Sequence, residues 1–544
     1  MSARLLNANL SPVLPNWGHQ PAPMEVITSG TVSIGLGAIR FHFAKNRSRR
    51  ATAIPSTERL LTDGGDARIV CGTNGRNQYG CSSLPEPEVL AYGSSTASTI
   101  SPIGFAAADA VRERLKTAAL TEAPVVTYER ELERLRRELT NLCGLDEATT
   151  AEIIFGASGT DLHLFASQLM VDPSAPCPLI VRVEAAETGR GVPDALAGRH
   201  FSDCAALGDA VMPNVPLDCG RPLDLLEVKC RAADGRLRPA SEVDAEVEEA
   251  VVRATAAGRR VLLTLVDVSK TGLLTPSPGC VDALRRRFPD LVEVLVDACQ
   301  FRLSSSTLKA YLEHDFLVAI TGSKFVTGPT FCGALFVPHK IAQRLKTRTL
   351  PRALKAYSAR ADWPRQWVAR LALNPVANFG LLLRWEAALA ELRAFRALSE
   401  TAIAEFLDTF AKAITGYLSQ HPAFELLATP ELDRSPIAPA DGWDRFPTIF
   451  SFLLLRSKSE GRTWLSQDET KKVHELLRAS RCQVGQPVAC GTRVGVPVSA
   501  LRLCVSTRLM VDALSSEGRG VQAVIAEALS VLEKTAILAS VPRS

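Results

Sequence analysis

The chain has 544 residues, of which 46% are hydrophobic and 22% charged, with a formal net charge of +4. These values are those of an ordinary globular protein, and so small a charge gives no reason to expect a nucleic-acid or anionic-membrane partner. No apolar run approaches the roughly 18 residues of a membrane span. The N-terminus lacks a continuous apolar segment, so we expect no secretory signal. The thirteen scattered cysteines suit reduced thiols in a cytoplasmic protein.

Several enzyme classes are not indicated because their short motifs are missing. The sequence has no Gly-Lys dipeptide, and therefore no Walker A loop. It also has no HExxH zinc motif, no GxSxG and no GxGxxG. We expect no metal site.

The composition changes along the chain and predicts four regions. Residues 1–105 are rich in Gly, Ser, Pro and basic residues and predict an N-terminal extension followed by a loop-rich segment. Residues 106–345 alternate strands with helices, which predicts a mainly parallel sheet covered by helices. Residues 346–394 predict a helical connector, with breaks at Trp363-Pro364 and Asn374-Pro375. Residues 395–544 fit a smaller α+β domain.

Individual elements follow from hydrophobic periodicity. Leucines spaced between Tyr128 and Leu142 predict a core-facing helix. A helix is also predicted over Glu242–Ala256, with Ser241 as its N-cap. The predicted strands are Glu152–Phe155, Pro178–Val183, Val261–Val266, Leu291–Val296, Phe316–Ile320, Cys332–Val337, Phe446–Leu455 and Leu501–Ser506.

Two of these strands deliver polar residues to their C-terminal ends. Leu291–Val296 ends on Asp297, and Phe316–Ile320 continues into Thr321-Gly322-Ser323-Lys324. In an α/β sheet, ligands bind at this edge of the strands. An acid and a lysine there predict a ligand crevice, although an Asp in this position also suits the start of a helix.

A third segment, Ser158-Gly159-Thr160, lies between a predicted strand and a predicted helix. Backbone N–H groups at a helix start, together with small hydroxyl side chains, form an anion site. An ordinary N-cap with a tight turn is the competing interpretation.

The order of these segments resembles the pyridoxal-phosphate (PLP) enzymes of fold type I, especially the class V aminotransferase and cysteine desulfurase group. The resemblance implies the PLP-dependent transferase (aspartate aminotransferase-like) fold. It implies that Asp297 pairs with the pyridinium nitrogen and that Gln300 donates to the ring oxygen. Lys324 would form the Schiff base and then act as the base at Cα.

The same resemblance assigns further residues. Ser158, Gly159 and Thr160 would hold the cofactor phosphate together with Thr321 and Ser323. Ser269 would lie near the ring oxygen, where the family has Asn. Arg502, in the segment LRLCVS, would bind the substrate α-carboxylate, and a solvated arginine at a strand edge is the alternative.

Two departures from the family pattern concern the ring face and the thiol nucleophile. The family places a ring on the cofactor face shortly after the strand Pro178–Val183, but the residues from Glu184 to Gly191 include none. Glu187, Thr188 or an aromatic residue from elsewhere would cover that face. In the desulfurases a cysteine precedes the arginine strand. Here Val488 falls at that place and Cys490 slightly late, so we expect no desulfurase of the usual mechanism.

The resemblance implies a PLP-dependent enzyme of the aminotransferase or lyase class that acts on an amino acid through an external aldimine. Two alternatives remain open. One is an elimination-replacement or C–C bond-forming enzyme acting on a substrate such as S-adenosylmethionine. The other is a PLP-fold binding protein without catalysis. The family also implies a homodimer and an N-terminal segment over the active site, with Ser94, Ser95 and Thr96 as candidates.

Overall fold

The computed structural model describes residues 54–146, 151–217, 223–439, 441–458 and 461–541. Most of the predicted N-terminal extension therefore lies outside the described residues. Residues 51–544 form one compact unit. No helix in the described ranges is long and apolar enough to cross a membrane.

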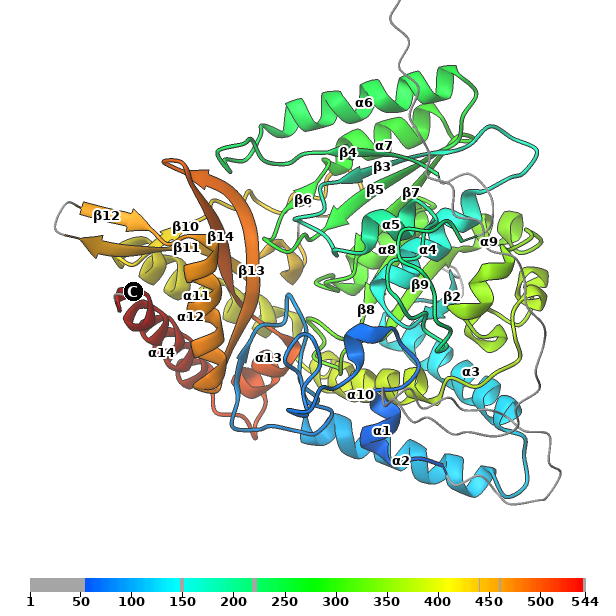
Figure 1. The fold of residues 1–544 in the computed structure, drawn as a ribbon, viewed down its shortest axis with the longest axis horizontal. Coiled ribbons are helices and arrows are strands. Elements are labelled where there is room, and N and C mark those ends of the chain that lie inside the picture. The colour runs from blue at the N-terminus through cyan, green and yellow to red at the C-terminus, as the bar shows by residue number, and fades with distance from the viewer. Residues whose placement is uncertain (1–53, 147–150, 218–222, 440, 459–460, 542–544) are drawn as a thin grey trace, which may run out of the picture. The chain divides into compact units, whose positions relative to one another are not determined.

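The larger of two sheets has eight strands in the order β2-β9-β8-β7-β5-β3-β4, with β6 paired to β5 (Figure 1). Neighbours from β8 through β4 are parallel, while β9 is antiparallel to both β2 and β8. Every residue of β5, β7, β8 and β9 is buried, as expected for strands covered on both faces. The strands are β2 Ala151–Gly156, β3 Leu179–Val183, β4 Asp224–Val228, β5 Val261–Asp267, β6 Leu274–Thr275, β7 Val292–Ala298, β8 Leu317–Thr321 and β9 Gly333–Pro338.

Helices cover both faces of this sheet because alternate strand residues point to opposite sides. One face packs with α4 (Gly159–Met170), α5 (Val192–Leu196) and α9 (His339–Leu345). The other packs with α3 (Pro124–Leu142), α6 (Ala240–Ala256), α7 (Pro278–Arg287), α8 (Ser305–Glu313) and α10 (Phe379–Arg396). Within β7, for example, Leu295 lies in the first core and Val294 and Val296 in the second.

The smaller sheet has six strands in the order β1-β13-β14-β11-β10, with β12 paired to β11. Its first strand, β1 (Leu90–Tyr92), comes from the N-terminal region and runs parallel to β13. The N-terminal segment is therefore built into this sheet (Figure 1). The other strands are β10 Phe424–Leu426, β11 Ile449–Lys458, β12 Gly461–Trp464, β13 Cys482–Arg493 and β14 Val496–Cys504, and the accompanying helices are α11 Glu400–Gln420, α12 Gln467–Ala479, α13 Thr507–Leu514 and α14 Val521–Ser540.

Each predicted strand has a counterpart within a few residues of its expected bounds. The predicted cap of helix α6 is wrong. The helix begins at Ala240 after Pro239, so Ser241 lies inside its first turn and does not cap it. Proline is well suited to a helix start because it needs no N–H partner there.

The N-terminal region and the connector are more irregular. Before helix α2 (Pro102–Ala118), residues 54–101 contain α1 (Thr57–Leu61), a short 3₁₀ turn and β1, and are otherwise without helix or strand. Between α9 and α10 the chain forms three short 3₁₀ helices rather than longer α-helices. The boundaries at residues 105, 345 and 394 stay predictions.

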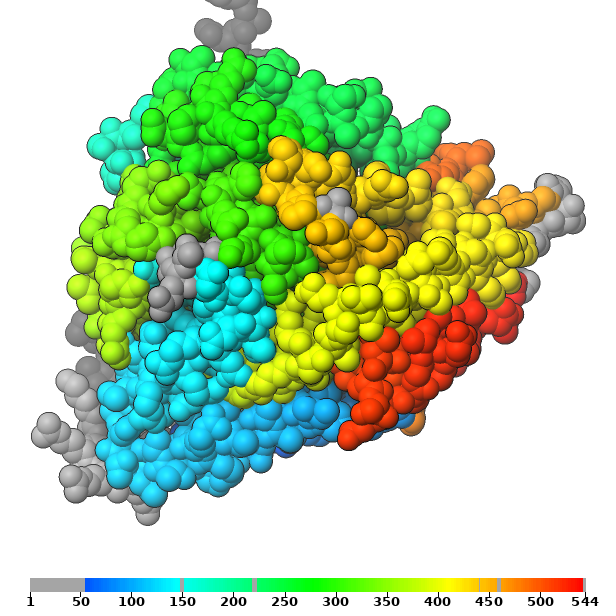
Figure 2. All heavy atoms as spheres, turned by 180° about the vertical axis from the view of Figure 1, so that it is seen from behind, coloured from blue at the N-terminus to red at the C-terminus, as the bar shows by residue number. Residues whose placement is uncertain are grey.

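A buried ion pair joins the end of β5 to the loop that precedes β11. Arg434 Nε and Nη2 each lie 2.7 Å from a carboxylate oxygen of Asp267, and both side chains are almost fully buried. The Tyr311 hydroxyl donates to the same carboxylate at 2.7 Å. Figure 2 shows the orange-yellow segment that contains residue 434 against green residues of the region that forms the large sheet. This ion pair therefore links the large sheet to the segment between β10 and β11.

We predict that Arg434→Met lowers the free energy of unfolding by about 3–5 kcal/mol, because it leaves the Asp267 carboxylate buried without its cation. Urea titration measures the change. The control is Lys412→Met, which removes an exposed ion pair with Asp408 and should cost under about 1 kcal/mol. Equal losses in the two variants would contradict the role of the pair.

Candidate functional site

A cavity of about 710 Å³ lies at the C-terminal edge of the large sheet. Loops after β5, β7 and β8 form its floor, and the N-terminal segment and strands β13 and β14 close it. The predicted site residues that line it are Ser158, Gly159, Thr160, Asp297, Gln300, Thr321, Ser323, Lys324 and Arg502. Of the predicted set, Ser269 alone is not part of this lining.

One end of the cavity lies at the start of helix α4, where backbone N–H groups favour negative charge. Ser158 is the N-cap of α4, and its hydroxyl accepts from the Asp161 backbone N–H at 3.3 Å in a capping box. Thr321 and Ser323 face the same end, and the Thr321 hydroxyl donates to the Cys299 carbonyl at 2.7 Å. Burial and the nearby Asp66 raise the pKa of Asp161 to about 7, which reduces the negative charge at this helix start.

Arg68, from the N-terminal segment, adds a fixed positive charge here. Its guanidinium donates to Thr160 Oγ1 at 3.2 Å and to Ser158 Oγ at 3.3 Å. Asp66 holds it in place at 2.6 Å, and it lies 4.7 Å from the Phe331 ring centre. Burial opposes its charge, but the hydrogen bonds to Asp66 raise the pKa of Arg68, so it stays protonated.

Asp297, at the end of β7, is the buried carboxylate of the site. It lies 3.2 Å from His163 Nε2 and accepts from the Cys299 backbone N–H at 3.2 Å. Burial alone would raise its pKa, but His163 and then Lys324 hold the pKa of Asp297 well below its usual range. The side chain is therefore ionised inside the protein.

His163 lies on α4, one turn after the anion-binding loop. Its Nδ1 is 2.7 Å from the Gly159 carbonyl, which fixes the ring with Nε2 toward Asp297. Burial lowers the pKa of His163, but the Asp297 carboxylate outweighs this and raises it. The pair connects the anion end of the cavity to the carboxylate at its floor.

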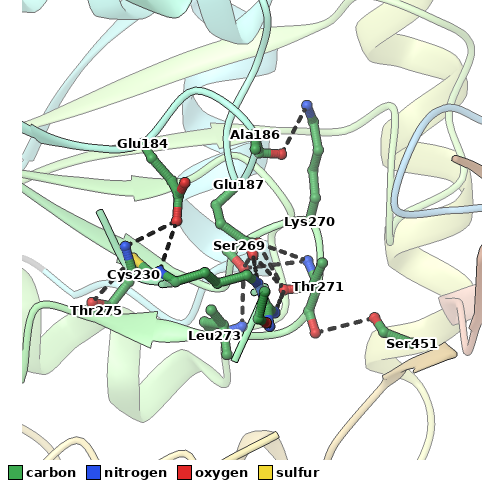
Figure 3. A network of polar contacts seen from close by, with 12 residues as sticks. Glu184, Ala186, Glu187, Cys230, Ser269, Lys270, Thr271, Leu273, Thr275 and Ser451 are labelled. Atoms are coloured by element: carbon green, nitrogen blue, oxygen red, sulfur yellow. Dashed lines mark hydrogen bonds and ion pairs between the residues drawn. The ribbon is translucent and has the colours of Figure 1, made fainter. Parts of the chain in front are cut away.

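Two lysines face the cavity. Lys324 follows β8 and is half-buried, and its ammonium has no hydrogen-bond partner in the described part of the chain. Lys270 follows β5, and its ammonium donates to the Ala186 carbonyl at 3.4 Å (Figure 3). Burial, followed by the charges of Arg502 and Lys324, lowers the pKa of Lys270 to about 7.

Ser269 does not line the cavity and belongs to a polar network around Glu187, which does. Its hydroxyl donates to Glu187 at 2.7 Å, and the Thr271 hydroxyl donates to the same carboxylate (Figure 3). Arg231 Nε completes the set at 3.0 Å from Glu187. A contact of Ser269 with a bound ring would require it to give up this bond.

Arg502, on β14, is fully buried beside the cavity. Its guanidinium donates to Thr96 Oγ1 at 3.2 Å, to the Gln486 carbonyl and to the Lys270 carbonyl at 3.4 Å. Its Nε has no partner among the described residues. Gln300 Nε2 donates to the Ser95 carbonyl at 3.0 Å. The N-terminal segment is therefore in direct contact with a residue of the cavity.

No protein-family model and no curated protein matches the sequence. Two solved structures of C-DES match at a TM-score of 0.50 and 15% identity. One is a lysine-to-alanine variant with glycine covalently linked to the PLP cofactor, and it matches over 81% of this chain and 96% of that one. The other is the complex of the cystine C–S lyase with its product cysteine persulfide, over 81% and 97%. The cysteine desulfurase CsdA from Escherichia coli matches at 0.48 and 12%, over 83% and 95%.

The chain has the fold of the PLP-dependent fold type I enzymes. This confirms the fold class expected from the order of the strands and of the motifs at their ends.

Within this fold the cysteines bear on the expectation about desulfurases. Cys490 is buried in β13, and Val488 rather than Cys490 lines the cavity. Burial raises the pKa of the Cys490 thiol, which disfavours the thiolate. Among the described residues, Cys299 is the one cysteine in the lining, and burial raises its pKa strongly. The described cysteines are all free thiols.

Sequence reasoning missed two residues of the site. Arg68 meets Ser158 and Thr160 across about ninety positions of the chain, and such a long-range contact has no local signal. His163 did have a local signal in the sequence, because it follows Gly159 by four residues and therefore lies on the same side of the helix. Among the described residues no three His, Cys, Asp or Glu side chains gather as metal ligands.

We predict that Asp297→Asn lowers the pKa of His163 below its usual value of about 6.5, because burial then acts without the opposing carboxylate. An NMR titration of the histidine ring measures it. Asp194→Asn, at another cavity carboxylate, is the control and should leave His163 unchanged. An unaltered pKa in the Asp297 variant would show that the two side chains are not coupled.

Proposed function

We propose that the protein is a PLP-dependent enzyme that acts on an amino acid and belongs to the transferase or lyase class. The observation that carries this proposal is the meeting, in one cavity, of an anion-binding helix start, a buried ionised carboxylate and a lysine. A cytoplasmic location and a homodimer belong to the same proposal. Light scattering of the active protein tests the dimer.

The residues present fit this cofactor in size and in chemistry. The cavity falls within the range of small-molecule sites, which is roughly 300–1,000 Å³. The lining also offers groups that suit a polar ligand, because the Lys324 ammonium has no hydrogen-bond partner in the described part of the chain and the hydroxyls of Ser158, Thr160, Thr321 and Ser323 belong to the wall.

We assign the residues at the start of α4 to the cofactor phosphate and Gln300 to the cofactor ring. Ser158, Thr160, Thr321 and Ser323, with Arg68, would hold the phosphate through hydrogen bonds and a fixed charge. Gln300 would donate to the ring oxygen. When bound, PLP supplies an electron sink for breaking bonds at the substrate Cα.

Three side chains would hold or move protons and fix the position of the substrate. Asp297, kept ionised by His163, would stabilise a proton on the ring nitrogen. Lys324 would bind the cofactor covalently and, once free, take the proton from Cα. Arg502 would fix the substrate carboxylate by hydrogen bonding, at a position closed from water by Thr96 and Gln486.

We predict that borohydride reduction of the PLP-loaded protein attaches a pyridoxyl group to Lys324. Peptide mapping by mass spectrometry locates the label. Lys324→Ala should lose both the label and the visible absorbance of the bound cofactor, whereas Lys270→Met should keep them. A label on Lys270 would refute the assignment, and a colourless wild-type protein that takes up no PLP would refute the proposed function.

We predict that Arg68→Met weakens PLP binding by about tenfold or more, because the phosphate loses a charge-assisted pair of hydrogen bonds. Equilibrium titration with PLP, followed by absorbance, measures the dissociation constant. Arg68→Lys should recover part of the affinity, since lysine keeps the charge but not the planar fork.

The matched control for Arg68 is Arg76→Met. Arg76 lies in the same N-terminal segment but pairs with Glu86 and does not line the cavity. It should bind PLP as the wild type does. If both variants lose affinity equally, the effect comes from loosening the segment and not from the guanidinium.

A further inference from the structure

Lys270 is a cation that lines the cavity and has no role in the proposed function. It lines the same cavity as Lys324, Arg502 and Arg190. Its backbone carbonyl accepts from Arg502 Nη1 at 3.4 Å, so it is adjacent to the proposed site for the substrate α-carboxylate. Among the described residues its ammonium has one hydrogen-bond partner, the Ala186 carbonyl at 3.4 Å.

The nearby carboxylates do not neutralise this cation. Glu187 already accepts from Ser269, Thr271 and Arg231 (Figure 3). Asp297 is paired with His163. Arg190, exposed at the cavity mouth, adds a second positive charge near Lys270 and has no ion-pair partner in the described ranges. Asp194 and Asp203 also line the cavity, but no hydrogen bond or ion pair in the described part of the chain joins either of them to Lys270. Lys270 is therefore a cavity cation without a paired carboxylate.

We propose that Lys270, assisted by Arg190, binds a second acidic group on the substrate side chain, so that the substrate is a dicarboxylic amino acid. This inference rests on the proposed function and deepens it. Arg502 and Lys270 would then hold the two ends of one substrate, each carboxylate meeting its own cation. An ammonium half-buried among other cations gains more from such a partner than one in water does, because the low dielectric strengthens the attraction.

The test compares matched pairs of ligands that differ only in the side-chain charge. L-aspartate and L-asparagine, and L-glutamate and L-glutamine, are titrated into the PLP-loaded protein, and the absorbance change of the cofactor gives each dissociation constant. We expect the better acidic ligand to bind about tenfold more tightly than its amide at about pH 6. Lys270→Met should remove most of this ratio while changing the amide affinity by less than about twofold.

Two further variants control the experiment. Lys472→Met changes an exposed lysine on α12 and should keep the wild-type ratio. Lys270→Arg should keep the preference, because it preserves the charge. If Lys270→Met does not fold, the wild-type pH dependence below replaces it.

The pH dependence follows from the groups that face Lys270, which are Arg502 on β14, Lys324 after β8, and Glu187 and Arg190 in the segment after β3. Burial, followed by the positive charges of Arg502, Lys324 and Arg190, lowers the pKa of Lys270 to about 7, while the Glu187 carboxylate acts in the opposite direction. The acid-to-amide affinity ratio should therefore fall as the pH rises above about 7, as the ammonium loses its proton. In Lys270→Arg the ratio should stay constant up to about pH 9, because arginine does not titrate there.

The outcomes separate the two levels of the proposal. Equal affinity for the acids and the amides overturns the dicarboxylic substrate, and a preference that survives Lys270→Met overturns the role of Lys270. Neither result touches the proposed function. Failure of the wild-type protein to take up PLP, or of any amino acid to perturb the bound cofactor, overturns the proposed function and this inference with it.

Discussion

The buried carboxylate of Asp297 is the constraint on which the rest of the site depends. An ionised group inside a protein is stable only when charges and hydrogen bonds replace its water. Here His163 and the Cys299 backbone N–H do so, with Lys324 nearby as a further positive charge. His163 is in turn fixed by the Gly159 carbonyl, which belongs to the anion-binding loop. The carboxylate at the end of β7 is thus connected through His163 to helix α4 and to the loop at its start.

Arginines that bind backbone carbonyl groups hold the N-terminal segment next to the rest of the protein. Arg302 donates to the Val505 carbonyl and to Ser94, which joins the end of β7 to the small sheet and to the N-terminal segment. Arg384, on α10, donates to the carbonyls of Leu61 and Gly64. A guanidinium has five donors in a rigid fork, so one side chain can hold several irregular stretches of backbone at once. This explains how a segment with little regular structure stays ordered enough to line a binding site.

The sequence predicted the large sheet and most of its polar edge because those features are local. Buried strands are short apolar runs, and the residues at their ends follow directly in the chain, as Asp297 and Lys324 do. Contacts between distant segments could not be predicted in this way. Arg68 reaches the start of α4, and Glu187 binds both Ser269 and Arg231, only because the fold brings these segments together. Ser241 shows the opposite limit, since a good capping residue two positions after the actual N-cap, Pro239, is simply part of the helix.

The charges in this cavity are specific to this sequence, whereas the position of the cavity follows from the fold. The fold determines that strand ends and loops meet at one edge of the sheet, but it does not determine which charges remain unbalanced there. Glu187 and Lys270 come from neighbouring loops, yet the carboxylate is fully occupied by Arg231 and two hydroxyls while the ammonium is not. A paired carboxylate contributes rigidity, whereas an under-partnered cation costs stability until an anion arrives. Since stability given up in the free protein is recovered on binding, such a cation favours ligands that carry the complementary charge.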